Sequence, residues 1–336
     1  MTKRERIISA VNHKQTDYVP YTVDFTQQEY KRVSDYLDDK NYINKIGNHI
    51  SSVYYDGYLS EINPGSGYWK DDFGVVWNRN GADKDIGVID GFVMNEPDIK
   101  QFILPELDEK RIRNQYEKLA ANEDNTFKFG SIGFSMFERA WTLRGMENIL
   151  IDMILDPEFV DDLLDAITDY NIRIIDIATE YKIDGFHFGD DWGQQQGLIM
   201  GPLHWRRFIK PRMARMYERV VSKGLIVSQH SCGDIHEIFP DLIDIGLNLY
   251  QTFQPEIYDL RTVKSEYGKH LTFWGGISTQ RLLPFATPEE VRRVTRETIR
   301  IMGEDGGFIA APTHAIPGDV PPENVVAMIE IFQNQI

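Results

Sequence analysis

Cysteine is nearly missing from this sequence of 336 residues, in which Cys232 is the only one. A single thiol excludes an intramolecular disulfide and is typical of a reducing compartment. Basic side chains are outnumbered by acidic ones, 36 against 52, which gives a formal net charge of −16. Binding to a polyanion needs a clustered basic face, so we expect no nucleic-acid partner.

Long apolar runs are missing too, because no stretch approaches the roughly 18–20 residues of a membrane-spanning helix. The first six residues lead into an amphipathic segment without the apolar core of a signal peptide. We therefore expect a cytoplasmic protein without a membrane partner. No Gly-x-Gly-x-x-Gly pattern opens a helix after the first predicted strand, so a Rossmann dinucleotide site is unsupported.

Short apolar runs recur along the chain, and most are followed by a helical segment. The eight predicted strands cover residues 21–25, 50–55, 127–133, 186–188, 225–228, 247–252, 271–274 and 308–311. Buried parallel strands have this continuous apolar pattern, and eight strand–helix units favour a barrel over an open sheet. We predict an α/β fold with one (β/α)8 TIM-barrel domain over residues 1–336. Residues 65–97, rich in Gly, Asp and Asn, are predicted to form a β-hairpin insertion.

Three local signals place helix boundaries. Thr2 and Glu5 have the spacing of a capping box, which predicts a helix from the third residue. Asp156 followed by Pro157 predicts the start of a long helix. Pro211 lies inside another helical segment and is expected to kink it, because proline lacks the backbone N–H.

Chemically reactive residues follow several predicted strands, at the end of a barrel where active sites lie. They are Asp24, Glu138, Asp190, Asp191, His230, Cys232, Gln251, Gln254, Ser278 and His314. His230 and Cys232 are two positions apart, so they can point the same way and share one metal ion. A thiolate with an imidazole suits zinc, and His314 follows the last strand as a third soft ligand. The alternative is that Cys232 is a small buried hydrophobic residue.

Several segments resemble the uroporphyrinogen decarboxylase superfamily, in order along nearly the whole chain. They include Gly-Asp-Asp-Trp-Gly at 189–193 and His-Ser-Cys-Gly-Asp at 230–234. The other similar segments are 4–6, 12–14, 17–20, 205–211, 306–312 and 322–324. The resemblance implies a barrel enzyme and leaves its substrate open.

Two details of the resemblance favour the corrinoid-dependent methyltransferase branch. Tetrapyrrole decarboxylases carry an arginine-rich N-terminal loop, but the matching segment 24–29 has no arginine before Arg32. The methyltransferases carry a zinc site of His-x-Cys plus a late cysteine, and this chain has His314 where that cysteine would be. The resemblance therefore implies Zn²⁺ bound by His230, Cys232 and His314, with Glu138 or solvent as fourth ligand.

Three acidic residues have more than one interpretation. Glu138 resembles an acidic position of demethylase-type relatives and could bind zinc or substrate. Alternatively, it is a glutamate on a helix face, paired with Arg139 or Arg144. Asp190 and Asp191 could support the metal ligands, hold the substrate, or cap a helix.

The function implied by the resemblance is methyl transfer from a small methylated substrate to the cobalt of a corrinoid (cobalamin), which a partner corrinoid-binding protein supplies. One cysteine and two histidines leave more positive charge on zinc than two cysteines do, which favours a Lewis-acid role at an ether oxygen. We therefore expect O-demethylation of an aromatic methyl ether. The alternatives are a methylcorrinoid:thiol methyltransferase, a uroporphyrinogen decarboxylase, or a non-catalytic protein that docks a corrinoid partner.

Overall fold

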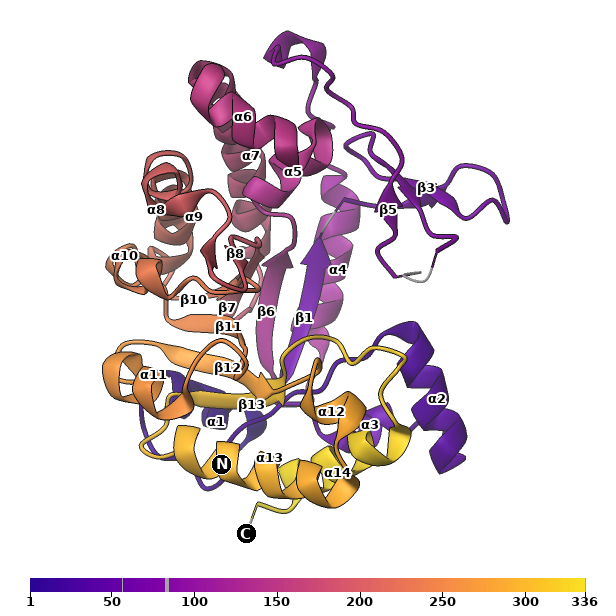
Figure 1. Cartoon of the computed structure of the whole chain (residues 1–336), viewed down its shortest axis with the longest axis vertical. Coiled ribbons are helices and arrows are strands. Elements are labelled where there is room, and N and C mark those ends of the chain that lie inside the picture. The colour runs from indigo at the N-terminus through magenta and orange to yellow at the C-terminus, as the bar shows by residue number, and fades with distance from the viewer. Residues whose placement is uncertain (56, 82–84, 336) are drawn as a thin grey trace.

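The computed structural model describes residues 1–55, 57–81 and 85–335. Within them, parallel strands form one curled sheet in the order β1-β6-β7-β10-β11-β12-β13 (Figure 1). These strands are β1 (Ile50–Tyr55), β6 (Phe127–Ile132), β7 (Gly185–Gly189), β10 (Ile226–His230), β11 (Leu249–Phe253), β12 (Thr272–Ile277) and β13 (Phe308–Pro312). Each corresponds to one predicted strand.

The remaining predicted strand, 21–25, closes the sheet without becoming a regular strand. It forms two isolated parallel bridges, from Tyr21 to Ala310 of β13 and from Phe25 to Ile316, which follows β13. On its other side, the side-chain amide of Asn48 accepts the backbone N–H of Val23 and donates to the carbonyl oxygen of Val23, both at an N···O distance of 3.0 Å. A side chain thus replaces the neighbouring strand at this point. The barrel prediction is confirmed, with its first strand reduced to bridges.

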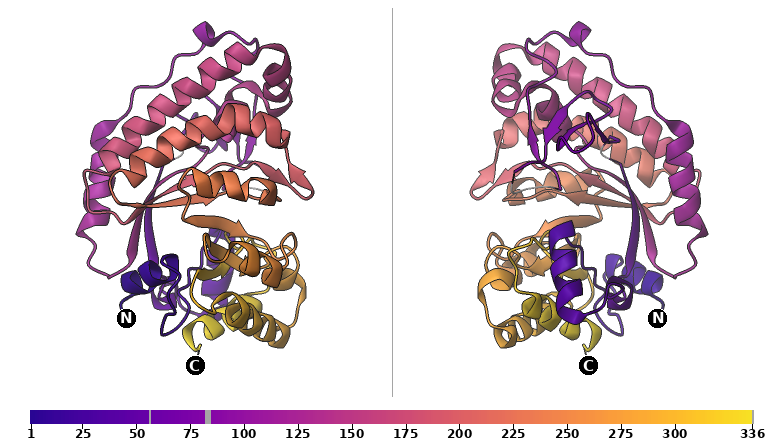
Figure 2. Two further views of the ribbon diagram at one scale, coloured as in Figure 1. Left: turned by 90° about the vertical axis from the view of Figure 1, so that its left-hand side faces the viewer. Right: turned by 90° about the vertical axis from the view of Figure 1, so that its right-hand side faces the viewer.

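Helices cover the outside of the sheet, and both chain ends lie at the same end of the molecule (Figures 1 and 2). Those before residue 180 are α1 (Lys3–Val11), α2 (Gln27–Leu37), α3 (Ile43–Ile46), η1 (Ile99–Gln101), α4 (Glu109–Ala121), α5 (Phe137–Arg144), α6 (Met146–Leu155) and α7 (Pro157–Ala178). Those after it are α8 (Gly201–His204), η2 (Trp205–Ile209), α9 (Lys210–Val221), η3 (His236–Ile238), α10 (Phe239–Asp244), α11 (Leu260–Tyr267), α12 (Leu282–Phe285), α13 (Pro288–Met302) and α14 (Pro322–Gln333). In the described part of the chain, no helix has both the length and the apolar character that crossing a membrane requires.

The hydrophobic core has a large part between the sheet and the helices. A smaller cluster contains side chains of β6, β11, β12, β13 and α1. Phe127 and Phe129 of β6 pack in the smaller cluster with Trp274 of β12. Alternate residues of a strand point to one side, which explains the spacing of the two phenylalanines. Ile7 and Val11 of α1 join this cluster, so the first helix supports the barrel interior.

The helix signals are largely found as predicted. Thr2 and Glu5 form the complete capping box of α1. Asp156 precedes Pro157 at the start of α7, although its side chain makes no capping hydrogen bond. The expected kink at Pro211 takes the form of a π-helical turn, η2, immediately before α9.

The insertion is larger than the predicted hairpin over 65–97. It forms a four-stranded antiparallel sheet beside α5 (Figure 1). Its strands are β2 (Ser60–Glu61), β3 (Tyr68–Lys70), β4 (Val76–Asn78) and β5 (Val88–Ile89). Residues 82–84 of the predicted insertion lie outside the described residues. A second small hairpin, β8 (Gly193–Gln194) with β9 (Gly197–Leu198), follows β7. That the whole chain is one domain stays a prediction.

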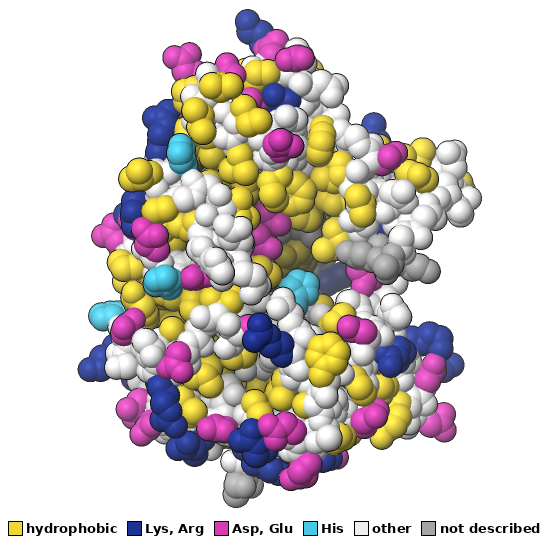
Figure 3. Space-filling view, in the orientation of Figure 1, with side chains coloured by type: hydrophobic (Ala, Val, Ile, Leu, Met, Phe, Trp, Pro, Cys, Tyr) yellow, Lys and Arg dark blue, Asp and Glu magenta, His cyan; other side chains and the backbone are white. Residues whose placement is uncertain are grey.

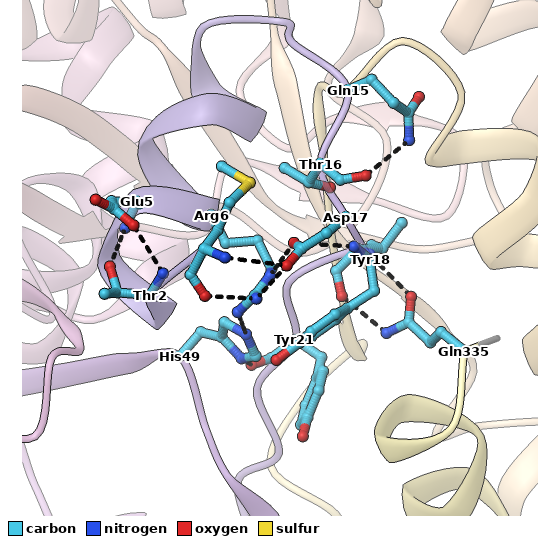
Figure 4. A network of polar contacts seen from close by, with 12 residues as sticks. Thr2, Glu5, Arg6, Gln15, Thr16, Asp17, Tyr18, Tyr21, His49 and Gln335 are labelled. Carbon is cyan, nitrogen blue, oxygen red and sulfur yellow. Dashed lines mark hydrogen bonds and ion pairs between the residues drawn. The ribbon is translucent and has the colours of Figure 1, made fainter.

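A partly buried polar network joins α1 to the first barrel segment (Figure 4). Arg6 donates to Asp17 at 2.6 and 2.8 Å and to Nε2 of His49 at 3.1 Å. The Nδ1 atom of His49 lies 3.1 Å from the carbonyl oxygen of Tyr21, so this nitrogen carries the proton. Burial, followed by the charge of Arg6, lowers the pKa of His49 from 6.5 to about 4. His49 is therefore neutral in the folded protein.

We expect the free energy of unfolding to fall as the pH drops through the range between these two pKa values. Below about pH 6.5 the unfolded chain binds a proton that folded His49 refuses, so stability is lost down to about pH 4. Between about pH 7 and pH 5 the loss should reach about 2 kcal/mol. Urea unfolding should show a smaller loss in His49→Gln, while His204→Gln, which alters a half-buried histidine on α8, should behave as wild type. Equal pH dependence in all three proteins would contradict this assignment.

Candidate metal site at the barrel mouth

Two neighbouring strands deliver the reactive residues to one place. β7 and β10 are paired so that Gly189 lies opposite His230. The residues that follow these ends, Asp190 and Asp191 on one strand and Cys232 on the other, therefore emerge side by side at the carboxyl end of the sheet. This is where a (β/α)8 barrel places its active site.

Asp191, His230 and Cys232 form a compact group of three different donor atoms. Their possible ligand atoms all lie within 4.8 Å of one another. The Nε2 atom of His230 is 3.5 Å from the sulfur of Cys232 and 3.3 Å from Oδ1 of Asp191. Sulfur, imidazole nitrogen and carboxylate oxygen are the ligands of zinc, and three protein ligands with an open position is the catalytic arrangement. The residues therefore fit a zinc ion.

His230 is held in the orientation that a metal ligand needs. Its Nδ1 atom contacts the amide oxygen of Gln251 on β11, which leaves Nε2 facing Cys232 and Asp191. Burial opposes a charge on the ring, but the sulfur of Cys232 and the carboxylate of Asp191 raise the pKa of His230 well above its ordinary value. The surroundings of the ring are therefore strongly negative, which would also favour the binding of a divalent cation.

His314 lies next to this group. Its ring centroid is 6.0 Å from that of His230, and its charge is among the influences that lower the pKa of Asp191. Burial acts against that lowering, and the hydrogen bond with His230 is the largest contribution in its favour. The three residues whose possible ligand atoms lie closest together thus include Asp191 and not His314. That His314 is a ligand stays a prediction.

Asp190 is not part of the three-residue group, and its carboxylate caps a helix. Its fully buried carboxylate accepts the backbone N–H groups of Met136, Phe137 and Glu138 at 3.2, 2.9 and 2.8 Å, together with the indole N–H of Trp192. Of the interpretations offered by the sequence, these contacts support capping, but the helix is α5, which lies more than 50 residues away along the chain. Asp190 therefore fixes where α5 begins.

Glu138 lies in the first turn of α5, close enough to Asp191, Asp190 and His230 for their charges to act on its carboxyl group. Burial raises the pKa of Glu138, and the charges of Asp191 and Asp190 raise it further. Among the described residues, Arg139 forms a buried ion pair with Asp71 and Arg144 forms one with Asp152. Glu138 is thus a half-buried carboxyl group facing the site.

Two glycines allow the loops after β7 and β10 to touch. A Cβ atom on Gly193 would lie 2.6 Å from the carbonyl oxygen of Cys232, and one on Gly233 would lie 2.3 Å from the carbonyl carbon of Gly193. Gly233 also has a φ of +79°, which side-chain-bearing residues rarely adopt. The loops can therefore approach closely only with glycine at both positions, which fixes Cys232 beside Asp191.

The sequence did not reveal the roles of Asp191 and Gln251. Both were recognised as residues at strand ends, but only the pairing of β7 with β10 and of β10 with β11 brings them against His230. The signal that could have found them is strand register, because Gln251 lies opposite His230 and Asp191 follows Gly189, which lies opposite His230 on the other side. In the space-filling view, acidic, histidine and hydrophobic side chains meet around a hollow across the middle of the molecule (Figure 3).

Comparison with known proteins gives three findings. The family model described as uroporphyrinogen decarboxylase (URO-D) matches residues 91–335. A methylated-thiol–coenzyme M methyltransferase of Methanosarcina mazei is 26% identical over 195 residues, 57% of this chain and 49% of the relative, so the chain spans about half the length of that curated protein. A solved methyltransferase structure from Methanosarcina mazei superposes with a TM-score of 0.73 at 18% identity, covering 100% of this chain and 99% of that chain. The last finding shows that the fold is shared over the whole length.

Proposed function

The chain belongs to the uroporphyrinogen decarboxylase (URO-D) family, and from this premise we propose that it is a zinc-dependent methyltransferase. Its donor is a small aromatic methyl ether, and its acceptor is the cobalt of a corrinoid carried by a partner protein. The observation that carries the proposal is the group Asp191, His230 and Cys232, whose donor atoms suit zinc. A tetracarboxylate substrate is disfavoured because the segment 24–29 contains no arginine.

The residues of the chain prepare the metal position. Gln251 keeps the Nε2 atom of His230 free for the metal, and the backbone N–H of Cys232 donates to Asp191 at 2.7 Å, which orients that carboxylate. His314 and Glu138 are the nearest candidates for a fourth ligand. A zinc ion held here would act as a Lewis acid on the ether oxygen and stabilise the departing phenolate.

Glu138 is suited to supply a proton to the departing oxygen. Burial and the neighbouring carboxylates raise its pKa, so its carboxyl group retains the proton more readily than an exposed glutamate. It stands at the start of α5, on the element that Asp190 holds in place. An acid at this position would assist cleavage of the alkyl–oxygen bond beside a Lewis-acid ion.

Thiol methylation is the second candidate, because the curated relative is named for methylated thiols. Zinc with two thiolate ligands keeps a bound substrate thiolate nucleophilic. This chain offers one cysteine and exchanges the other for oxygen or nitrogen, which leaves the metal more electron-poor. The ligand set therefore favours the ether as substrate.

A turnover assay separates the candidates. Zinc-loaded protein is mixed either with cob(I)alamin and guaiacol or with methylcobalamin and a small thiol, and the methylation state of cobalt is followed by its absorbance. We expect guaiacol to methylate cobalt and the thiol to accept little methyl. Transfer to the thiol alone would establish a thiol methyltransferase. If neither pair reacts, release of carbon dioxide from uroporphyrinogen would establish a decarboxylase, and its absence a binding protein.

A further inference from the structure

Three aromatic rings gather between the end of β6 and the start of α5. Phe134, two residues after that strand, stacks on Trp77 of the insertion with ring centroids 5.7 Å apart and planes 26° apart. Trp141 of α5 meets Phe134 edge-on at 6.3 Å. Trp77 is buried, but Phe134 and Trp141 are each only half-buried. Each of these two residues therefore keeps part of its surface accessible.

The backbone of Phe134 is in an unusual conformation. Its φ is +44°, in the left-handed region that bulky residues avoid, and such strain is concentrated at functional sites. A ring that served only to fill the core could be supplied from a relaxed backbone. Here the surroundings hold Phe134 in this conformation: Trp77 covers one side, and the guanidinium of Arg139 lies 5.5 Å from its centroid.

A buried carboxylate links the inserted sheet to α5. Asp71 accepts the backbone N–H of Val75 at 2.9 Å, the indole N–H of Trp77 at 3.3 Å and a guanidinium N–H of Arg139 at 3.1 Å. The Asp71 and Arg139 side chains are 2% and 3% exposed, so solvent cannot replace this pairing. The same arginine lies 3.9 Å from the ring centroid of Phe73. Movement of the inserted sheet would therefore move α5.

α5 links the aromatic rings to the chemistry. It carries Glu138 and Trp141 within one turn, and the carboxylate of Asp190 accepts hydrogen bonds from the backbone at its start. The strands of the inserted sheet precede residue 91, where the match to the family model begins. The aromatic cluster thus joins the part of the chain that carries the metal site to a part that the family model does not include.

We propose that Phe134 and Trp141, held by the inserted sheet, form a binding subsite for the uncharged aromatic ring of the substrate. The ligand is a neutral aryl ring such as that of a phenolic methyl ether, which can pack against both half-exposed rings in offset or edge-on geometry. This inference rests on the proposed function for the identity of the donor. Asp71 is a positioning residue, because it acts on the rings through Trp77 and Arg139.

The test is equilibrium binding of guaiacol to zinc-loaded protein, followed by ligand-observed NMR without corrinoid or turnover. Phe134→Leu keeps an apolar side chain but loses the ring face, so the Kd should rise by about five-fold or more while zinc content stays the same. Phe92→Leu, at an exposed phenylalanine outside the cluster, is the matched control and should bind as wild type. If Phe134→Leu fails to fold, Trp141→Leu carries the same expectation.

The positioning role has its own comparison. Asp71→Asn should weaken guaiacol binding in the same direction, again with unchanged zinc content. Asp152→Asn breaks an equally buried pair with Arg144 at the other end of α5 and should affect binding less. Equal losses of guaiacol affinity in both variants would show that Asp71 only stabilises the fold, and would overturn its assignment as a positioning residue.

The outcomes keep this inference apart from the proposed function. Wild-type affinity in Phe134→Leu and Trp141→Leu overturns the subsite, even if methyl transfer is observed. Guaiacol binding that depends on both rings, in a protein that transfers no methyl group, upholds the subsite and overturns the methyltransferase.

Discussion

Replacing Cys232 with alanine is expected to remove bound zinc and to lower methyl transfer by about three orders of magnitude. The thiolate is the softest of the three closest donors, and its loss leaves only an imidazole and a carboxylate in the group. Stabilisation of a departing oxygen by a metal is worth several kcal/mol, and each 1.36 kcal/mol corresponds to about ten-fold in rate. The barrel itself should stay folded, because Cys232 lies at the mouth and not in the core.

Two measurements check this result. Elemental analysis should find near-stoichiometric zinc in the wild type and little in Cys232→Ala, and chelated wild-type protein should be as slow as the variant. His270→Ala, at an exposed histidine remote from the three ligands in sequence, should retain both zinc and activity. Unchanged zinc content in Cys232→Ala would exclude Cys232 as a ligand, and fast demethylation by metal-free protein would exclude the Lewis-acid role.

Replacing Asp190 with alanine is expected to reduce the free energy of unfolding by about 4 kcal/mol, because it leaves buried donors without an acceptor. The carboxylate is fully buried and serves the first backbone N–H groups of α5 and the indole of Trp192. Water has little access to replace it. The variant should also lose activity, since Glu138 depends on the position of α5.

Urea unfolding followed by circular dichroism measures this change. Asp162→Ala, which removes an exposed carboxylate from α7, should stay within about 0.5 kcal/mol of the wild type. Asp190→Asn keeps the size of the side chain and should lie between the two. A loss below about 1 kcal/mol in Asp190→Ala would mean that the N–H groups find other partners.

The fold was largely predictable because buried parallel strands leave continuous apolar runs in a sequence. The irregular first strand was not, since it depends on Asn48, a polar side chain more than 20 residues away that takes the backbone groups of Val23. The four-stranded insertion was underestimated for a related reason. Its strands have only two or three residues each, too short to show a periodic pattern.

The candidate site was predictable only in part. His230 and Cys232 share one strand end, so their spacing alone brings them together. Asp191 and Gln251 come from neighbouring strands, and their contacts with His230 depend on strand register, which no local pattern encodes. Asp190 serves a helix that begins far earlier in the chain, so the motif revealed its acidity but not its partner.

The way the barrel closes has a consequence for how the protein folds during synthesis. The backbone N–H of Thr22 donates to Ala310 and that of Val19 to the side chain of Gln335, so the seam joins residues up to 316 positions apart. Contacts so distant in sequence form late, because a long loop must first be ordered. Until then, β1 presents an unpaired strand edge, which invites association with other chains. His314 lies just beyond β13, so this proposed zinc ligand should reach His230 only after β13 has joined the sheet.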